Sequence, residues 1–160
     1  MKTRRLVVLT FAVASLIVIG VAVATPPKGL VGTPLARGGA DELRIRDYSQ
    51  GFRLRARNPT DVALVKATVD PGGYTGWHGH AGPSLVIVKT GTLAMYLPNR
   101  RRNGCTVETF GPGSAFDHPS GPHNFVNAGS ETLEFYVAYF LPKGASPAPI
   151  DALAPAGCPS

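Results

Sequence analysis

The chain has 160 residues, and 16 Lys and Arg side chains against 10 Asp and Glu give it a formal charge of +6. A chain of this length can bury a substantial core but is too short for two ordinary domains. The charge excess does not indicate a nucleic-acid-binding protein, because three of the cations, Lys2, Arg4 and Arg5, stand together at the extreme N-terminus. The rest of the chain keeps a small positive charge, which is ordinary for one small domain.

Residues 1–24 have the pattern of an export leader. Their cations precede an uncharged apolar run that ends in Ala22-Val23-Ala24, a small-x-small cleavage site. The run is also nearly long enough to span a hydrocarbon layer of about 30 Å. We therefore expect a signal peptide cut after Ala24, with an uncleaved anchor as the alternative. Either form places the domain outside the cytoplasm, as a secreted or extracytoplasmic protein, and only the anchor gives it a membrane contact.

Cys105 and Cys158 are the two cysteines of the chain. An even pair in an oxidising compartment favours a disulfide, which would tie the Pro/Ala-rich tail, residues 146–160, onto the domain. The alternatives are two free thiols or a cysteine that binds metal. Both are disfavoured, because the two cysteines are far apart in the sequence and form no Cys-x-x-Cys pair.

Turn residues divide the exported part into short strand-like runs, in line with its 19 Gly and 15 Pro. The expected strands are residues 42–46, 52–56, 62–69, 84–89, 92–97, 106–110 and 133–141. Many short strands predict an antiparallel sandwich or barrel. We expect residues 25–40 to be a flexible N-terminal segment that precedes this domain.

Residues 52–57 alternate apolar side chains with Arg53, Arg55 and Arg57. Such alternation predicts a strand that lies half buried on the outside of a sheet. The arginine row could bind a polyanion, but a solvated face is the better interpretation, since no aromatic residues interleave with it. The run at 100–102 is expected to be an exposed loop tip.

The four histidines of the chain fall in two windows, residues 71–80 and 118–123. On a strand, His78 and His80 point to the same face because side chains alternate with a period of two. Neutral imidazoles that converge on one point bind divalent transition metals. The alternative is that the histidines only form hydrogen bonds inside a polar cavity.

The residues around the histidines resemble the two motifs of the cupin superfamily. The first, Gly-x5-His-x-His-x3–4-Glu-x6-Gly, is matched at Gly72, His78, His80 and Gly91. The second, Gly-x5-Pro-x-Gly-x2-His-x3-Asn, is matched at Gly113, Pro119, Gly121, His123 and Asn127. The resemblance implies a single all-β domain over residues 41–145, a double-stranded β-helix or jelly-roll barrel, with a metal or ligand site inside its mouth. The chain is similar to small exported bacterial single-domain cupins, whose reactions are mostly unassigned.

Two departures from these motifs matter. Ser84 occupies the position of the glutamate, and a hydroxyl is a poor ligand that could instead orient a bound water. The second motif is one residue shorter between Gly121 and His123. His123 is still the better third ligand, because it keeps the spacing to Asn127; His118 could support a ligand from behind or face solvent. Three neutral ligands would leave a divalent ion its full +2 charge and would hold it less tightly.

Four aromatic residues flank the motifs: Tyr74, Trp77, Tyr96 and Phe125. As a group they could line the mouth of a pocket and favour an apolar or aromatic ligand over a phosphate, although each could also simply pack in the barrel. Catalytic residues are not identified, because no nucleophile has a base at hand.

The sequence leaves three functions open. The first is an exported metal-dependent enzyme with dioxygenase-like or isomerase/hydrolase-like chemistry on a small organic molecule. The second is a non-catalytic module that binds a small molecule or metal, and the third is a structural protein whose interior is only core. The metal could be Zn, Fe, Mn, Ni or Cu, since histidine suits all of them. The resemblance makes a homodimer plausible, and no nucleic-acid partner is expected.

Overall fold

The computed structural model of the protein describes residues 24–99, 101, 103–118 and 120–159, which form β-strands and no helix. The strands are β1 (Lys28–Ala40), β2 (Leu43–Asp47), β3 (Phe52–Ala56), β4 (Thr60–Tyr74), β5 (His78–Gly79), β6 (Ser84–Thr90), β7 (Leu93–Asn99), β8 (Gly104–Phe110), β9 (Ala115–His118), β10 (Asn124–Asn127), β11 (Leu133–Pro142) and β12 (Ile150–Asp151). All seven runs that were expected to be strands form strands.

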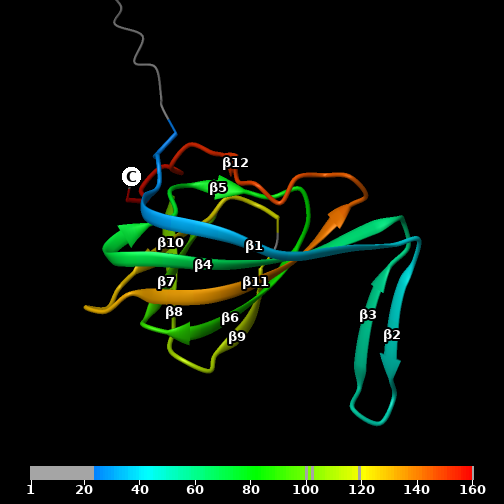
Figure 1. Ribbon diagram of the computed structural model, residues 1–160. Coiled ribbons are helices and arrows are strands. Elements are labelled where there is room, and N and C mark those ends of the chain that lie inside the picture. The colour runs from blue at the N-terminus through cyan, green and yellow to red at the C-terminus, as the bar shows by residue number, and fades with distance from the viewer. Residues whose placement is uncertain (1–23, 100, 102, 119, 160) are drawn as a thin grey trace, which may run out of the picture.

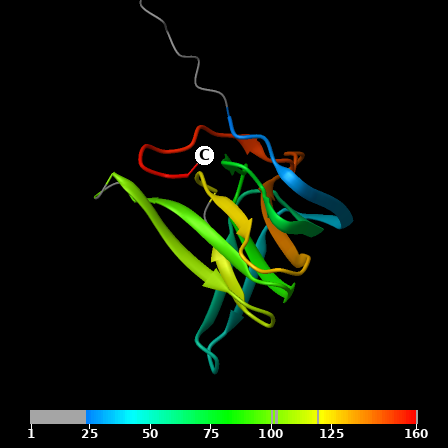
Figure 2. The ribbon, with the colours of Figure 1, turned by 90° about the vertical axis from the view of Figure 1, so that its left-hand side faces the viewer.

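Eight of the strands make one antiparallel sheet, ordered β8-β7-β10-β4-β11-β6-β9, with β1 added alongside β4. The sheet curls round on itself, so that β7 and β8 lie on one side and β1 and β11 on the other (Figures 1 and 2). This nearly closed antiparallel barrel is the all-β jelly-roll architecture that the motifs predicted, and that prediction is confirmed.

The barrel core is built by strict alternation along the central strands. In β11 every second side chain from Leu133 to Leu141 is buried, and the residues between them, such as Glu134 and Tyr136, are half-buried. Val86 and Val88 of β6 face the same interior. Burying one such aliphatic side chain contributes about 1.5–3 kcal/mol, so this face supplies much of the driving force for folding.

The expectation of a flexible segment at residues 25–40 is wrong, because residues 28–40 form β1. This strand pairs with β4 along its length, from Lys28 opposite Tyr74 to Ala40 opposite Thr60. Its glycines and Pro34 concealed it, since they interrupt any alternating pattern. The ladder accommodates the proline with a register shift next to it, as edge strands and bulges commonly do.

The arginine-bearing run at residues 52–57 also lies elsewhere than expected. It forms β3, which pairs only with β2 in a separate two-stranded sheet. Figure 1 shows this hairpin projecting away from the barrel instead of covering it.

The C-terminal tail crosses one end of the barrel (Figure 1). Cys105 and Cys158 are joined in a disulfide with a Cα–Cα distance of 5.3 Å. The indole nitrogen of Trp77 donates a hydrogen bond of 2.7 Å to the carbonyl of Pro159. Earlier in the tail, β12 pairs with β5. The tail is therefore part of the fold and lies beside the strand that carries His78.

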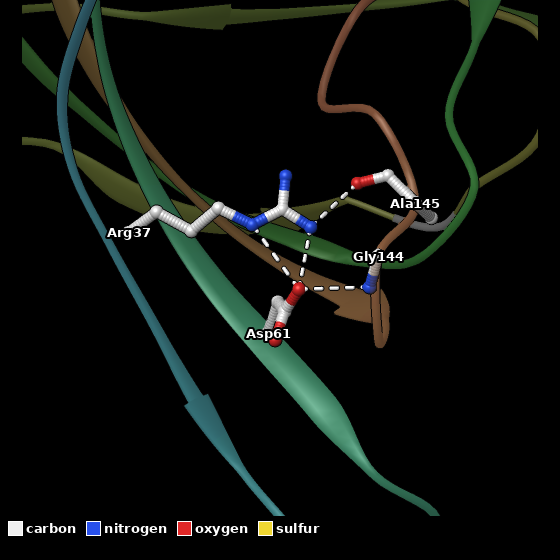
Figure 3. Close-up of polar contacts among 4 residues, drawn as sticks. All are labelled: Arg37, Asp61, Gly144 and Ala145. Atoms are coloured by element: carbon white, nitrogen blue, oxygen red, sulfur yellow. Dashed lines mark hydrogen bonds and ion pairs between the residues drawn. The ribbon is translucent and has the colours of Figure 1, made fainter.

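The side chain of Asp61 forms hydrogen bonds that hold the residues before the tail (Figure 3). Oδ2 of Asp61 accepts hydrogen bonds from the backbone N–H of Gly144, at 2.9 Å, and from the guanidinium of Arg37. The same guanidinium donates to the carbonyl of Ala145 at 2.8 Å. One carboxylate thus joins β1, β4 and the residues that follow β11.

The leader expected at residues 1–24 lies outside the described residues apart from Ala24. Within the described part of the chain, no helix has the length and apolarity needed to cross a membrane.

Reducing the disulfide should destabilise the domain. The bond closes a loop of 53 residues, and the loss of loop-closure entropy corresponds to about 4 kcal/mol on the chain-entropy model. Urea unfolding of the oxidised and reduced protein measures this difference, with a Cys105→Ser/Cys158→Ser variant as the control for side effects of the reductant. Coincident unfolding curves would show that the bond contributes nothing.

Acid should weaken the hydrogen bonds that the Asp61 carboxylate accepts, because protonation removes its charge. The Gly144 N–H and the Arg37 guanidinium lower the pKa of Asp61 below its ordinary 3.8. A carboxyl with a lowered folded-state pKa contributes stability that is complete above the unfolded value and is lost as pH falls through the folded one. Below about pH 4 the wild type should therefore lose stability faster than Asp61→Asn, as measured by urea unfolding at several pH values. Asp70→Asn, at an exposed carboxylate, is the matched control for the loss of one negative charge.

Candidate metal centre

Two segments that are distant in sequence meet at the candidate site and are joined through their backbones. The N–H of His78 donates to the carbonyl of His123 at 3.0 Å, and the N–H of His123 donates back to His78 at 2.9 Å. On either side, Thr75 bonds to the Phe125 carbonyl and His80 to the Ser120 carbonyl, at 2.8 and 3.0 Å. This short antiparallel ladder fixes the two histidine windows against each other.

Gly79 permits the close approach of these segments. A Cβ atom at this position would stand 2.8 Å from the carbonyl oxygen of Ser120, closer than van der Waals contact allows. The glycine therefore lets the strand pass while His78 and His80, two positions apart, point to the same side.

The structure brings His78, His80 and His123 together. Each offers one ligand atom, and these atoms lie within 4.8 Å of one another. All three residues are buried, with at most 8% of their surface exposed. The ring centroids of His78 and His123 are 4.1 Å apart, and that of His80 is 4.8 Å from His78.

Hydrogen bonds orient two of the three rings. Nδ1 of His78 lies 2.8 Å from the carbonyl of Gly76, and Nδ1 of His123 lies 3.0 Å from that of Gly121. A carbonyl oxygen only accepts, so Nδ1 carries the proton in both rings and Nε2 keeps a free lone pair. Nδ1 of His80 is buried with no hydrogen-bond partner among the described residues. An unpaired nitrogen beside two free lone pairs is suited to a shared cation.

Burial keeps these rings uncharged. Desolvation is the main cause that lowers the pKa of His78, lowers that of His80 to about 3, and places that of His123 far below the ordinary 6.5. The neighbouring histidines add repulsion that lowers the pKa of His80 and His123 further. Neutral imidazole is the form that binds a metal ion, so the site is ready for one at physiological pH.

Ser84 and His118 lie next to this cluster. They face each other across β6 and β9, and both are buried. The ring of His118 packs on that of His123 with centroids 3.7 Å apart, and it is 1% exposed, so the alternative in which His118 faces solvent is wrong. Burial lowers its pKa to about 4. His118 is therefore a buried ring packed against His123, and its Nε2 has no hydrogen-bond partner among the described residues.

A cavity of about 350 Å³ adjoins the three histidines. It is lined by Leu30, Gly32, Pro34, Val65, Ala67, Thr75, His78, His80, Ser84, His123, Phe125, Phe135, Val137, Tyr139, Ser146, Pro147, Ala148 and Pro149. This lining contains no Asp, Glu, Lys or Arg. Asp117, within the second motif, and Glu108, shortly before it, are exposed. The cavity is therefore apolar, with neutral polar groups gathered at the histidines.

Of the four aromatic residues expected at the pocket, only Phe125 is in this lining. Trp77 is fully buried and holds the tail through Pro159. Tyr74 ends β4, where it pairs with Lys28 and Val126, and Tyr96 lies in β7 opposite Asn124. These three rings belong to the barrel wall, and their closeness to the motifs in sequence did not place them in the cavity.

Sequence reasoning missed two parts of the cavity wall. Tyr139 of β11 lies against His80 with ring centroids 4.7 Å apart, and burial raises its pKa to about 12. Its inward direction could have been found from the alternation of β11, in which Phe135, Val137 and Tyr139 share a face. The other part is residues 146–149 of the tail, and no sequence signal marks their place.

Asn127, the last residue of the second motif, has a structural role. Its side-chain amide donates to the carbonyls of Val69 and Glu131 at 2.9 and 2.8 Å, and its oxygen accepts from the Gly129 N–H. It therefore fixes the turn that follows β10 and, through it, the segment that carries His123.

No protein-family model and no curated protein matches this chain. Solved structures do match it. The polyketide cyclase RemF from Streptomyces resistomycificus is 23% identical, aligns over 91% of this chain and 87% of its own, and has a TM-score of 0.53. A cupin domain from Bordetella pertussis is 21% identical over 72% of this chain and 97% of its own, with a TM-score of 0.46. An oxalate decarboxylase variant from B. subtilis is 18% identical, and the match covers 57% of this chain but 24% of that one, at a TM-score of 0.49.

At these identities the likeness concerns the fold. The chain has the cupin fold, as its two motifs predicted, and the three-histidine cluster that this fold displays fits metal binding.

The buried histidines should make the metal-free protein sensitive to mild acid. Because their folded-state pKa values lie below the ordinary 6.5, the unfolded chain binds more protons as pH falls below 6.5. Each histidine that stays neutral then costs about 1.4 kcal/mol of stability per pH unit. Urea unfolding at pH 7 and 5 measures this loss, and the imidazole NMR signals of His80, His118 and His123 in the folded protein should not titrate in that range. A folded-state titration near the ordinary pKa would contradict the burial argument.

Proposed function

We propose that this cupin-fold protein binds one divalent transition-metal ion through His78, His80 and His123 and a small apolar organic molecule beside it. The observation that carries the proposal is the meeting of three buried, uncharged imidazoles at the wall of one cavity, with their ligand atoms within 4.8 Å of one another. Nitrogen donors suit Zn, Fe, Mn, Ni and Cu, and disfavour Mg and Ca, which prefer oxygen.

The chain's own groups define what such a site would do. His78, His80 and His123 would hold the ion, which would act as a Lewis acid and acidify bound water. Ser84, in place of an acidic ligand, adds no negative charge and can hydrogen-bond a water or a ligand oxygen. Tyr139 presents a hydroxyl whose raised pKa keeps it protonated, so it acts as a hydrogen-bond donor near His80.

The rest of the lining favours an apolar ligand. Phe125, Phe135 and Val137 give the cavity hydrophobic lining, as do tail residues 147–149, and no ionised side chain in the lining balances a charge on the ligand. A ligand that reaches the ion through one acidic oxygen and buries a hydrocarbon body would satisfy both parts of the cavity. We infer that the protein is a metal-dependent enzyme that acts on such a molecule. The three metal-binding histidines would be essential for its activity.

A non-catalytic binding module is the second candidate. The observation that favours it is the lack of a carboxylate in the cavity lining, which leaves no general base apart from the histidines that would bind metal. Turnover of a small aromatic or aliphatic substrate that stops when a chelator is added would support the enzyme, whereas tight binding without turnover would support the module.

We also propose that the protein is exported. The disulfide between Cys105 and Cys158 and the leader-like pattern of residues 1–24 support this location, because disulfides persist in oxidising compartments.

Metal reconstitution tests the proposed function. Dialysed protein incubated with Zn, Mn, Fe or Ni should take up about one ion per chain, as counted by elemental analysis after gel filtration. A His78→Ala/His80→Ala variant should take up none. Full metal uptake by this folded double variant would overturn the assignment of these ligands.

Ser84→Glu is a matched variant that should strengthen metal binding, whereas the histidine variant should abolish it. A carboxylate at this position adds the charged ligand that the site lacks, and should tighten metal binding about tenfold or more. Ser84→Ala, which only removes the hydroxyl, should leave metal uptake close to wild type. Weaker binding by a folded Ser84→Glu protein would place the ion away from Ser84.

A further inference from the structure

The β2–β3 hairpin is a ribbon with two unlike faces. Its register sets Arg44 opposite Arg55 and Arg46 opposite Arg53. Residues that face each other across an antiparallel pair project from the same side of the ribbon, so these four guanidinium groups share one face. All four residues are exposed.

Little negative charge in the hairpin offsets this face. Arg55 contacts Glu42 at 3.3 Å, and both side chains are exposed to solvent. The carboxylate of Asp47 instead accepts hydrogen bonds from the N–H groups of Ser49 and Gln50 within the turn, at 2.9 and 3.2 Å. Like charges set directly opposite each other destabilise a strand pair, so an anionic partner would stabilise the hairpin.

The other face is apolar and open to water. Ile45 pairs with Leu54, and Phe52 pairs with Asp47, the one acidic residue on this face, whose carboxylate is bound to the turn. Ile45 is 53% exposed and Phe52 50%. Tyr48 at the tip is 79% exposed, and its hydroxyl accepts a hydrogen bond of 3.3 Å from Arg46 of the arginine face. Leu54 is half-buried and lines a pocket between the hairpin and the barrel together with Phe140. The outer half of the hairpin projects from the barrel (Figure 1), although a two-stranded ribbon on its own is only marginally stable in water.

We propose that this hairpin docks the protein on an anionic lipid bilayer surface. Amphipathic segments with arginines on one face and aromatic or aliphatic side chains on the other lie in the membrane interface, where the apolar face enters the acyl region and the cations reach lipid phosphates. An acidic protein or polymer would neutralise the arginines but leave Ile45 and Phe52 in water. A second copy of the hairpin would cover the apolar face but bring together two sets of unbalanced arginines. A lipid surface satisfies both faces.

A tryptophan reporter tests this docking in the full chain. Phe52→Trp adds an indole to the apolar face, while the single native Trp77 is fully buried. The new indole emission should shift to the blue with vesicles of phosphatidylcholine and phosphatidylglycerol, and much less with phosphatidylcholine alone. The shift should weaken at high salt, which screens the phosphates.

Charge variants in this reporter background separate the hairpin from the rest of the chain, including the apolar run at residues 6–24. Arg46→Gln/Arg53→Gln removes two opposed cations, and should lower the ratio of anionic to neutral vesicle binding about tenfold or more. Lys28→Gln/Lys143→Gln, which removes the same charge from exposed positions outside the hairpin, should leave that ratio near wild type. The same charge variants without Phe52→Trp contain Trp77 alone, and its unchanged emission would show that the barrel is intact.

Several outcomes would overturn the proposal. One is an indole that stays in water with anionic vesicles, and another is an equal loss in both double variants. Binding to soluble polyglutamate that depends on Arg46 and Arg53, without any emission shift on vesicles, would assign the hairpin to acidic polymers. A dimer in sedimentation that Phe52→Ser dissolves would assign it to a second copy of the chain.

Discussion

The candidate site depends on one backbone interaction, the reciprocal hydrogen bonding of His78 and His123. Residues paired in this way lie directly opposite each other, so the backbone sets the side chains of the two windows side by side before any ion is bound. The other edge of β5 is occupied by β12, where Asp151 stands opposite His78. The strand that carries His78 is thus held on both edges, which limits the positions its ring can take.

The distant parts of the chain are arranged to keep this pairing in place. Asn127 fixes the turn beyond His123, while the disulfide and the Trp77 hydrogen bond hold the tail over β5. The hydrogen bonds of Asp61 hold the chain at the other end of the same tail. Because the tail also walls the cavity, the contacts that stabilise the fold are the ones that shape the space beside the histidines. Preorganisation of this kind reduces the ordering cost of binding a ligand.

The sequence predicted the strands and site residues that local alternation and motif spacing determine. It missed the segments whose structure depends on pairing with distant parts of the chain. The alternation of β11 and the spacing of His78, His80 and His123 are readable, because a strand's period of two and a motif's spacing are local properties. Strand β1 was missed because glycines and Pro34 conceal alternation, and long β4 supplies the ladder that makes it a strand. The tail's place in the cavity and the departure of β3 from the barrel follow from contacts with distant segments, which composition does not record.

The same alternation explains why charge and chemistry are separated in this molecule. Within the barrel, one face of each strand meets a low-dielectric interior, where desolvation lowers the pKa of each histidine and leaves neutral rings available to a metal. The Lys and Arg residues that the structure describes are exposed or half-buried. In β2 and β3 the alternation continues without a core to receive the apolar face, so Ile45 and Phe52 stay exposed behind a row of arginines. A strand pattern that buries one face in the barrel therefore leaves the outer half of the hairpin, with Ile45, Phe52 and its arginines, exposed to a partner.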